Sequence, residues 1–254
     1  MTDPTPPAPG PRRDDSLEDF ELPFFQWIAI QLQGLVIAII VRSTDLLLLL
    51  WRPSLLRPYL GLWWQRLLLT PYSARRTFEM VRALQSTGQS FRELIYGETP
   101  LLTALLFLRR AGVGSRSRVV DLGAGRGRVL IAARWLRAQS HGVELIADHV
   151  KRVAPWLEPA GITLTVGDMT REPLTDATHI FTNWVAFTPE TKARLVAHLR
   201  TCQPGTRIIT VTRPIQAEGF IGHSYRWMLF TWGPEKVWIQ EYRPEISIPS
   251  GNQE

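Results

Sequence analysis

The sequence predicts an α/β fold in which a parallel β-sheet is covered by helices on both faces. Between residues 119 and 213, short apolar runs alternate with longer amphipathic segments, and this alternation is typical of a parallel sheet. Two β-rich runs follow at 225–232 and 236–243, and the Gly-Pro-Glu between them predicts a hairpin. A long uncharged stretch near the N-terminus predicts a hydrophobic helical extension.

Each element of the predicted sheet follows from its own local pattern. A first strand, VVDL, turns at a glycine cluster into a helix whose apolar side chains recur at helical spacing in RVLIAARWL. The later strands are short and rich in β-branched residues, in the order HGVEL, LTVGD, THIFTNW and RIITVTR. The longer segments between them predict helices, among them IADHVKRVAPWL and TPETKARLVAHLR.

The residues before this domain divide into three parts of different composition. Residues 1–23 are acidic, rich in proline and poor in apolar side chains, which predicts disorder. Residues 24–70 form a hydrophobic segment that begins with 18 uncharged residues, FFQWIAIQLQGLVIAIIV, just long enough for a spanning helix. Residues 71–95 predict connecting helices, the main domain occupies 96–245, and a tail follows at 246–254.

The hydrophobic segment is expected to associate with a membrane. Trp27, Trp51, Trp63 and Trp64 carry amphipathic rings of the kind that settle at the lipid headgroup level, beside arginines that can reach the interface. The alternative is a helical cap on the soluble domain, which Gln26, Gln31 and Gln33 favour.

Charge on either side of the segment predicts its orientation. Six acids and two arginines precede Phe24, whereas residues 42–76 contain six arginines and one aspartate. The positive-inside rule counts basic residues and places the downstream side in the cytoplasm. We therefore expect a membrane-associated protein whose main domain is cytoplasmic, with the segment either spanning once or lying in the inner leaflet.

The glycine cluster predicts a nucleotide-type cofactor site. Gly123, Gly125 and Gly127 follow Asp121 in the pattern G-x-G-x-G, whereas a dinucleotide fingerprint requires its third glycine one position later. A carboxylate at the strand tip repels a pyrophosphate, while S-adenosylmethionine (SAM) has no phosphate and carries an ammonium and a sulfonium. The charge therefore favours SAM over NAD. The alternative is a tight turn without a ligand.

Acidic residues also end the next two predicted strands. Glu144 lies 23 positions after Asp121, near the spacing at which a second-strand acid binds ribose hydroxyls. Asp168 ends the third strand, where its carboxylate or the neighbouring backbone can meet the adenine edge. Each acid alone is often a solvated strand end, but three at successive strand tips predict a SAM site.

These motifs resemble class I SAM-dependent methyltransferases, and more specifically the non-SET lysine methyltransferases of the disruptor of telomeric silencing type. Over roughly 90–215 the chain carries, in order, YGET, DLGAGRG, GVE, GD and TNWVAFTPE. Thr182 stands where that family has asparagine, and Trp184-Val185 replace its phenylalanine. The resemblance implies a seven-stranded class I (Rossmann-like) sheet whose last strand is antiparallel.

A second resemblance is to mitochondrial lysine methyltransferases that modify membrane proteins. Those enzymes likewise combine a hydrophobic N-terminal segment with a compact methyltransferase core. By resemblance to the first family, Glu98 and Thr99 would hold the methionine end of SAM. Their alternative role is an N-cap for the helix that begins PLLTALLFL.

Four residues are candidates for the slot that receives the methyl acceptor: Asn183, Tyr96, Trp184 and Phe187. Methyl transfer needs an aligned, unprotonated nucleophile, and alignment alone is worth about 7–11 kcal/mol. The side-chain carbonyl of Asn183 can accept from an amine, and aromatic walls lower the pKa of a lysine by desolvation. The alternatives are a helix cap for Asn183 and core positions for the two aromatics that follow it.

The expected function is therefore N-methylation of a lysine in a membrane or membrane-associated protein. The alternatives are a methyltransferase for a phospholipid amine or a quinone, and a non-catalytic scaffold with the same fold. Cys202 is the only cysteine and the five histidines lack metal-ligand spacing, so neither a disulfide nor a metal is expected. The net charge of +6 suits an anionic membrane surface; nucleic acid is a less expected partner. A domain without residues 1–70 is expected to remain soluble and bind SAM.

Overall fold

The structure is a computed structural model that describes residues 24–67 and 98–244. The predicted disordered lead at 1–23, the connecting helices at 71–95 and the tail at 246–254 lie outside the described residues.

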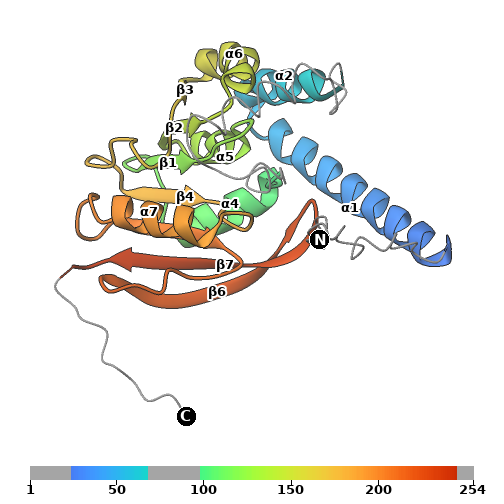
Figure 1. Ribbon diagram of the computed structural model, residues 1–254. Coiled ribbons are helices and arrows are strands. Elements are labelled where there is room, and N and C mark those ends of the chain that lie inside the picture. The colour runs from blue at the N-terminus through green and yellow to red at the C-terminus, as the bar shows by residue number, and fades with distance from the viewer. Residues whose placement is uncertain (1–23, 68–97, 245–254) are drawn as a thin grey trace, which may run out of the picture.

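Within the described residues, seven strands form a single sheet in the order β3-β2-β1-β4-β5-β7-β6 (Figure 1). The strands from β3 to β5 pair in parallel, while β7 is antiparallel to both of its neighbours. This is the Rossmann-like order with one antiparallel strand inserted, and it confirms the predicted class I methyltransferase fold. The strands are β1 Arg118–Leu122, β2 Gln139–Glu144, β3 Ile162–Val166, β4 His179–Thr182, β5 Arg207–Val211, β6 Phe220–Phe230 and β7 Gly233–Tyr242.

The sheet separates two apolar cores because successive strand residues point to opposite faces. Val119 packs in the core formed with α4, α5 and α6, whereas Val120 packs in the core formed with α7. The helices of the domain are α4 Leu101–Arg110, α5 Arg128–Trp135, α6 Ala147–Leu157 and α7 Pro189–Leu199, with a 3-10 turn η3 at Glu158–Ala160.

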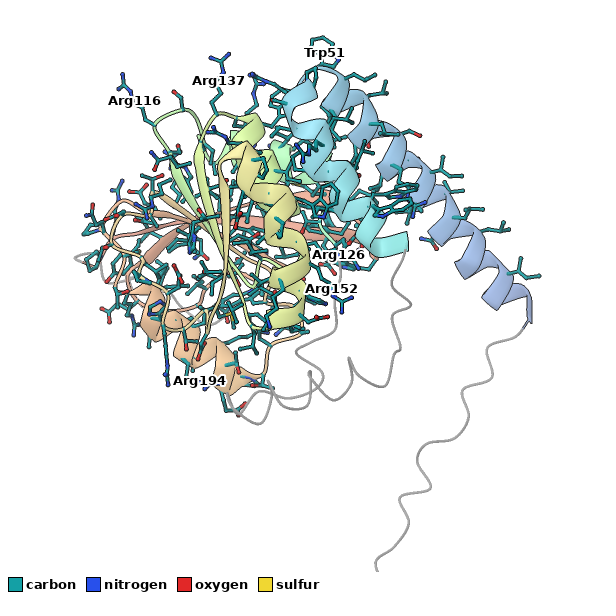
Figure 2. All side chains as sticks on the ribbon, turned by 90° about the horizontal axis from the view of Figure 1, so that it is seen from above. Trp51, Arg116, Arg126, Arg137, Arg152 and Arg194 are labelled. Carbon is teal, nitrogen blue, oxygen red and sulfur yellow. The ribbon has the colours of Figure 1, made fainter. Side chains whose placement is uncertain are left out.

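The N-terminal extension forms a further layer over α4, α5 and α6. It consists of α1 Phe24–Leu50, a 3-10 turn η1 at Pro53–Leu55, and α2 Leu56–Leu67. Gly61 of α2 approaches Trp156 of α6 so closely that a Cβ at position 61 would overlap the indole ring. Trp51, at the turn between α1 and α2, points away from the body and is 82% exposed (Figure 2).

The two halves of α1 lie in different environments. Val41, Asp45 and Leu49, spaced four residues apart on one face, are buried against the domain. The preceding half leaves the body (Figure 1), and five of its apolar side chains are 47–57% exposed: Leu32, Leu35, Val36, Ile39 and Ile40. Among the described residues, Leu32–Leu50 is long and apolar enough to cross a membrane, and 17% of it is buried. The two alternatives for this segment therefore apply to different halves of α1. The C-terminal half covers the core of the domain, and the N-terminal half exposes apolar surface.

The predicted hairpin is formed by β6 and β7. Because β6 runs parallel to β5, the tip of the hairpin lies at the carboxyl edge of the sheet. There Thr231 Oγ1 accepts from the backbone N–H of Glu98 at 3.2 Å and donates to the Glu98 carbonyl at 3.0 Å. The last strand pair of the chain therefore holds the segment that precedes α4.

Candidate functional site

The predicted cofactor residues gather at the carboxyl edge of the sheet, where ligands of open α/β sheets bind. Asp121 lies near the end of β1, Glu144 ends β2, and Thr182 ends β4 next to Asn183. Since β2, β1 and β4 are adjacent and parallel, one local folding pattern brings all four side chains to the same edge. The sequence-based prediction of a single site at the strand tips is consistent with this placement.

The glycine turn between β1 and α5 requires glycine at each of its three positions. Gly123, Gly125 and Gly127 have φ values of 83°, 53° and 77°, in the left-handed region that favours glycine. A Cβ at Gly127 would approach Leu157 Cδ1 to 2.8 Å, which shows why α5 packs closely there. A Cβ at Gly123 would meet nothing within 4 Å. The turn is thus tight where it meets the helix and open at its beginning.

Glu144 fastens the glycine turn to the next loop. Its Oε2 accepts from the Gly125 N–H at 2.8 Å, and its Oε1 accepts from the Ile146 N–H at 3.0 Å. Burial raises the pKa of Glu144, and these backbone N–H groups oppose the rise. A carboxylate oxygen has room for more than one donor, so ribose hydroxyls can share these oxygens.

Asp121 is the most unusual polar group of the site. It is 2% exposed, and among the described residues its Oδ1 has no hydrogen-bond partner. Burial and the nearby Glu144 raise the pKa of Asp121 well above its ordinary value. A buried carboxylate without a partner is costly, and a cationic ligand group at this position removes that cost. The ammonium of SAM has the required charge, so the residues present fit this cofactor.

Asp168 shapes the loop that follows β3. Its Oδ1 accepts from both the N–H and the hydroxyl of Thr170, at 2.9 and 2.8 Å. This local turn occupies one carboxylate oxygen. The other oxygen lies 3.9 Å from Arg171 Nε, so the adjacent backbone is the group left to meet an adenine edge.

Glu98 and Thr99 are buried next to the glycine turn. Glu98 Oε1 lies 3.1 Å from Arg126 Nη1, and Glu98 Oε2 lies 3.0 Å from Arg128 Nη2. Neither Glu98 nor Thr99 caps α4, whose N-cap residue is Pro100. Their side of the site is therefore built from an acid of one loop, an arginine of the glycine turn and the first residue of α5.

The four acceptor-slot candidates have different environments. Asn183 is half-buried, and within the described chain its Oδ1 has no partner. Trp184 is a core residue instead: it is 4% exposed, and its indole N–H donates to the carbonyls of Val211 and Arg213, each at 3.1 Å. Phe187 is partly buried against the same core. Tyr96 lies outside the described residues.

The helix-cap alternative for Asn183 does not hold. Thr188 is the N-cap of α7, and its side chain accepts from the Thr191 N–H at 3.3 Å. The side-chain carbonyl of Asn183 remains available for a ligand. No group of three or more potential metal ligands occurs among the residues that the structure describes.

Three residues of this region were not predicted: Asp45, Arg126 and Arg128. The two arginines are in the glycine motif, but an arginine in a loop is usually solvated. Asp45 is the sole acidic residue of α1, and it accepts from the backbone N–H groups of Leu101 and Leu102 at the start of α4. A lone carboxylate in an otherwise apolar helix was the available signal, because such a group must find partners.

Comparison with known proteins gives the fold. No protein-family model and no curated protein matches the chain. Among solved structures, TrmN from Thermus thermophilus has a TM-score of 0.50 at 18% identity, over 59% of this chain and 51% of that one. This chain thus spans about half of the length of TrmN. The likeness supports the fold that the strand order already establishes.

Two further structures resemble the chain with lower TM-scores. An RNA methyltransferase from Salinibacter ruber, in complex with S-adenosyl-L-homocysteine, has a TM-score of 0.49 at 24% identity, over 62% of this chain and 99% of that one. The magnesium protoporphyrin IX methyltransferase of Synechocystis, with bound SAM, has a TM-score of 0.47 at 14% identity, over 70% of this chain and 89% of that one.

Proposed function

We propose that this protein is a SAM-dependent methyltransferase that binds a membrane and methylates a lysine of a membrane or membrane-associated protein. The observation that carries the cofactor assignment is the buried, unpartnered oxygen of Asp121 at the glycine turn. A phosphate-bearing cofactor would meet a negative charge there, whereas SAM brings a cation.

We propose the following residues as the ones that would hold SAM. Asp121 and the Glu98 loop flank its methionine end, the glycine turn provides close backbone approach, and Glu144 takes the ribose hydroxyls. Asp168 and its loop meet the adenine. When bound, SAM supplies a methyl group on a sulfonium, which leaves as a neutral thioether and needs no acid.

Asn183 is proposed to orient the acceptor nitrogen. Its free, buried Oδ1 follows β4 at the same edge as Asp121, and a carbonyl oxygen accepts from an amine N–H and so directs the lone pair. A lysine has an ordinary pKa of about 10.4, so deprotonation at pH 7 costs on the order of 4 to 5 kcal/mol. Desolvation at the slot reduces that cost because it disfavours the cation. An amine acceptor is the best match to these groups.

The membrane assignment rests on α1 and α2, which pack on the domain with one side and expose the other. The outer side carries large apolar and aromatic residues: Leu46, Leu47, Leu50, Trp51, Leu60, Trp63 and Trp64. Arg42 and Arg57 are exposed beside them. Tryptophans with arginines at the rim are typical of a surface that lies at the lipid interface. We propose that the second half of α1 and α2 lie along the interface, on the cytoplasmic side.

The same surface would serve a lipid substrate, which is the second candidate. Purified protein is incubated with membranes and radiolabelled SAM, and the label is then separated into protein and lipid fractions. Label in protein that survives delipidation and yields methyl-lysine on hydrolysis supports the proposal. Label in phospholipid or quinone assigns the alternative. If wild-type protein transfers no label to either fraction, the enzymatic assignment fails; if Asn183→Ala transfers as much label as wild type, Asn183 is removed from the site.

A further inference from the structure

Asp45 of α1 is the centre of a buried polar cluster. It is fully buried, and its Oδ2 accepts from the hydroxyl of Tyr59 of α2 at 2.6 Å. Its Oδ1 accepts from the Leu101 and Leu102 N–H groups at 3.0 and 3.4 Å. Arg128 Nη1 lies 3.4 Å from its Oδ2. One carboxylate thus joins four separate helices.

The partners of Asp45 lead directly to the cofactor site. Leu101 begins α4 and follows Glu98-Thr99-Pro100, so the capped helix end fixes the segment that carries Glu98. Arg128, the first residue of α5, contacts Asp45 through Nη1 and Glu98 through Nη2. Its guanidinium also lies 5.3 Å from the ring centre of Tyr59. A change at Asp45 therefore reaches Glu98 by two routes, one through the backbone and one through Arg128.

Apolar packing alone could attach α1 to the domain, without a buried carboxylate and its partners. Val41 and Leu49 already bury apolar surface on the same face of α1, and such burial stabilises without a charge. A buried carboxylate is costly: burial raises the pKa of Asp45, while Tyr59, Arg128 and the two backbone N–H groups oppose the rise. Buried charges of this kind specify one arrangement of their partners more than they add stability.

We propose that Asp45 is a positioning residue for the cofactor site: it sets the positions of Arg128 and the α4 N-terminus, and through them the position of Glu98. The inference rests on the proposed cofactor, and it makes α1 part of the SAM site and not a separable anchor. Removal of Asp45 is expected to weaken cofactor binding although Asp45 itself does not touch the cofactor.

Full-length protein in detergent is titrated calorimetrically with S-adenosyl-L-homocysteine, a probe that does not turn over. Asp45→Asn, which preserves shape and removes the charge, is expected to bind at least about tenfold more weakly, as for other residues that orient ligand-contacting groups. Two controls are expected to stay within about twofold of wild type. Asp176→Asn removes an exposed carboxylate paired with Arg118, and Leu49→Ala loosens the apolar packing of α1 and lowers the melting temperature.

A double variant distinguishes positioning from loss of packing. In Arg128→Gln the route through Arg128 is already broken and only the backbone route remains, so Asp45→Asn is expected to weaken binding by a smaller factor in that background than in wild type. Equal factors in the two backgrounds overturn the route through Arg128. If Asp45→Asn does not fold, Tyr59→Phe replaces it, since it removes only the hydroxyl that donates to Asp45; weaker binding supports the inference and unchanged binding overturns it.

The remaining outcomes are equally decisive. A folded Asp45→Asn protein with wild-type affinity overturns the inference and leaves the proposed function intact. Equal weakening by Leu49→Ala also overturns it, because loosening alone would then explain the effect. If wild-type protein does not bind S-adenosyl-L-homocysteine, the proposed cofactor fails and the inference fails with it.

Discussion

Two regions of the molecule each bury an aspartate, and the two carboxylates differ in their partners. At the junction of α1 with the domain, both oxygens of Asp45 have donors from three other helices. At the glycine turn, Oδ1 of Asp121 has no partner among the described residues. A satisfied buried carboxylate holds a structure together, whereas an unsatisfied one is retained at a cost that a ligand can remove. Asp45 is thus part of the structure that supports the proposed site, whereas Asp121 is the group proposed to bind the cofactor.

Deletion of the junction, the part of α1 whose Val41, Asp45 and Leu49 are buried against the domain, is expected to have the largest effect on stability and ligand binding. A protein that lacks residues 1–50 loses Asp45 and Leu49, and the loss of one buried leucine side chain alone costs about 2–5 kcal/mol. We expect it to aggregate and to bind no S-adenosyl-L-homocysteine. A protein that lacks residues 1–40 keeps the junction and is expected to bind normally, by calorimetry.

This pair of deletions also tests a sequence-based expectation. Removal of residues 1–70 was expected to leave a soluble, SAM-binding domain, but Asp45, Leu49, Tyr59 and Leu62 are buried against that domain. The contacts argue against that expectation. A stable, ligand-binding protein without residues 1–50 would contradict the role assigned to the junction.

Asp121→Asn is expected to separate binding from stability. Loss of the charge weakens SAM binding by roughly 10–100-fold, the range for a hydrogen bond to a charged group. The ligand-free protein is expected to melt at a higher temperature at pH 7, because the substitution removes a buried carboxyl group whose Oδ1 has no partner among the described residues. Calorimetry and thermal unfolding of the same sample measure both quantities. A lower melting temperature would show that Asp121 is satisfied in the free protein.

Asn183→Ala is expected to lower turnover without a matching loss of cofactor affinity. The proposed contact is to the acceptor nitrogen, so kcat on the protein substrate falls by about 100-fold while the affinity for SAM changes little. Single-turnover rates and calorimetry check the two values separately. Trp184→Phe is the matched comparison, since Trp184 is a core residue and its substitution affects stability first.

Ile39→Asp is expected to affect only the exposed half of α1. Loss of one apolar side chain at a lipid surface, together with its replacement by a charge, weakens binding to vesicles of neutral and anionic phospholipid by about tenfold or more. The affinity for S-adenosyl-L-homocysteine is expected to stay unchanged, because Ile39 is 56% exposed and outside the junction. Gln33→Glu, which adds charge at an already polar exposed position, serves as the control in the same sedimentation assay.

The pH dependence of stability is expected to be the smallest effect. The pKa values of Asp121 and Glu144 are raised in the folded state from ordinary values of 3.8 and 4.5. The folded protein therefore holds these protons more tightly, and the free energy of unfolding falls as pH rises from about 4 through the folded pKa values. Denaturant titrations of ligand-free protein should show this fall, and Asp121→Asn should reduce it.

The sequence predicted the glycine turn well because its determinants are local. Three glycines with positive φ and an acid at or near the end of each of the first three strands can be read from short stretches of sequence, because each belongs to one strand-turn-helix unit. The hairpin itself was predicted, but its turn was misplaced: the turn lies at 231–232, and the predicted turn residues 233–235 belong to β7. These features depend on neighbours in the chain and need no knowledge of the fold.

The junction could not be predicted in the same way because its contacts are distant in the chain. Asp45 contacts Leu101 and Arg128, which lie 56 and 83 positions away. The apolar composition of its helix indicated a membrane segment and gave no sign of these contacts. Trp184 stayed undecided for a related reason, since only the fold reveals that its indole N–H reaches the carbonyl of Val211 at the end of β5 and that of Arg213 just after it. Tyr96 remains a prediction.

The hydrogen bonds between Thr231 and Glu98 can form only late in the synthesis of the chain. The two residues are 133 positions apart, and a ribosome makes Glu98 long before it makes the hairpin tip that holds it. A nascent chain that already contains the glycine turn, α5 and β4 still lacks the hydrogen bonds between Thr231 and Glu98. Contacts between residues so distant in sequence also form slowly. The segment that carries Glu98 can therefore gain these two hydrogen bonds only after β6 and the hairpin tip have been made, and a chain that ends before β6 is expected to lack them.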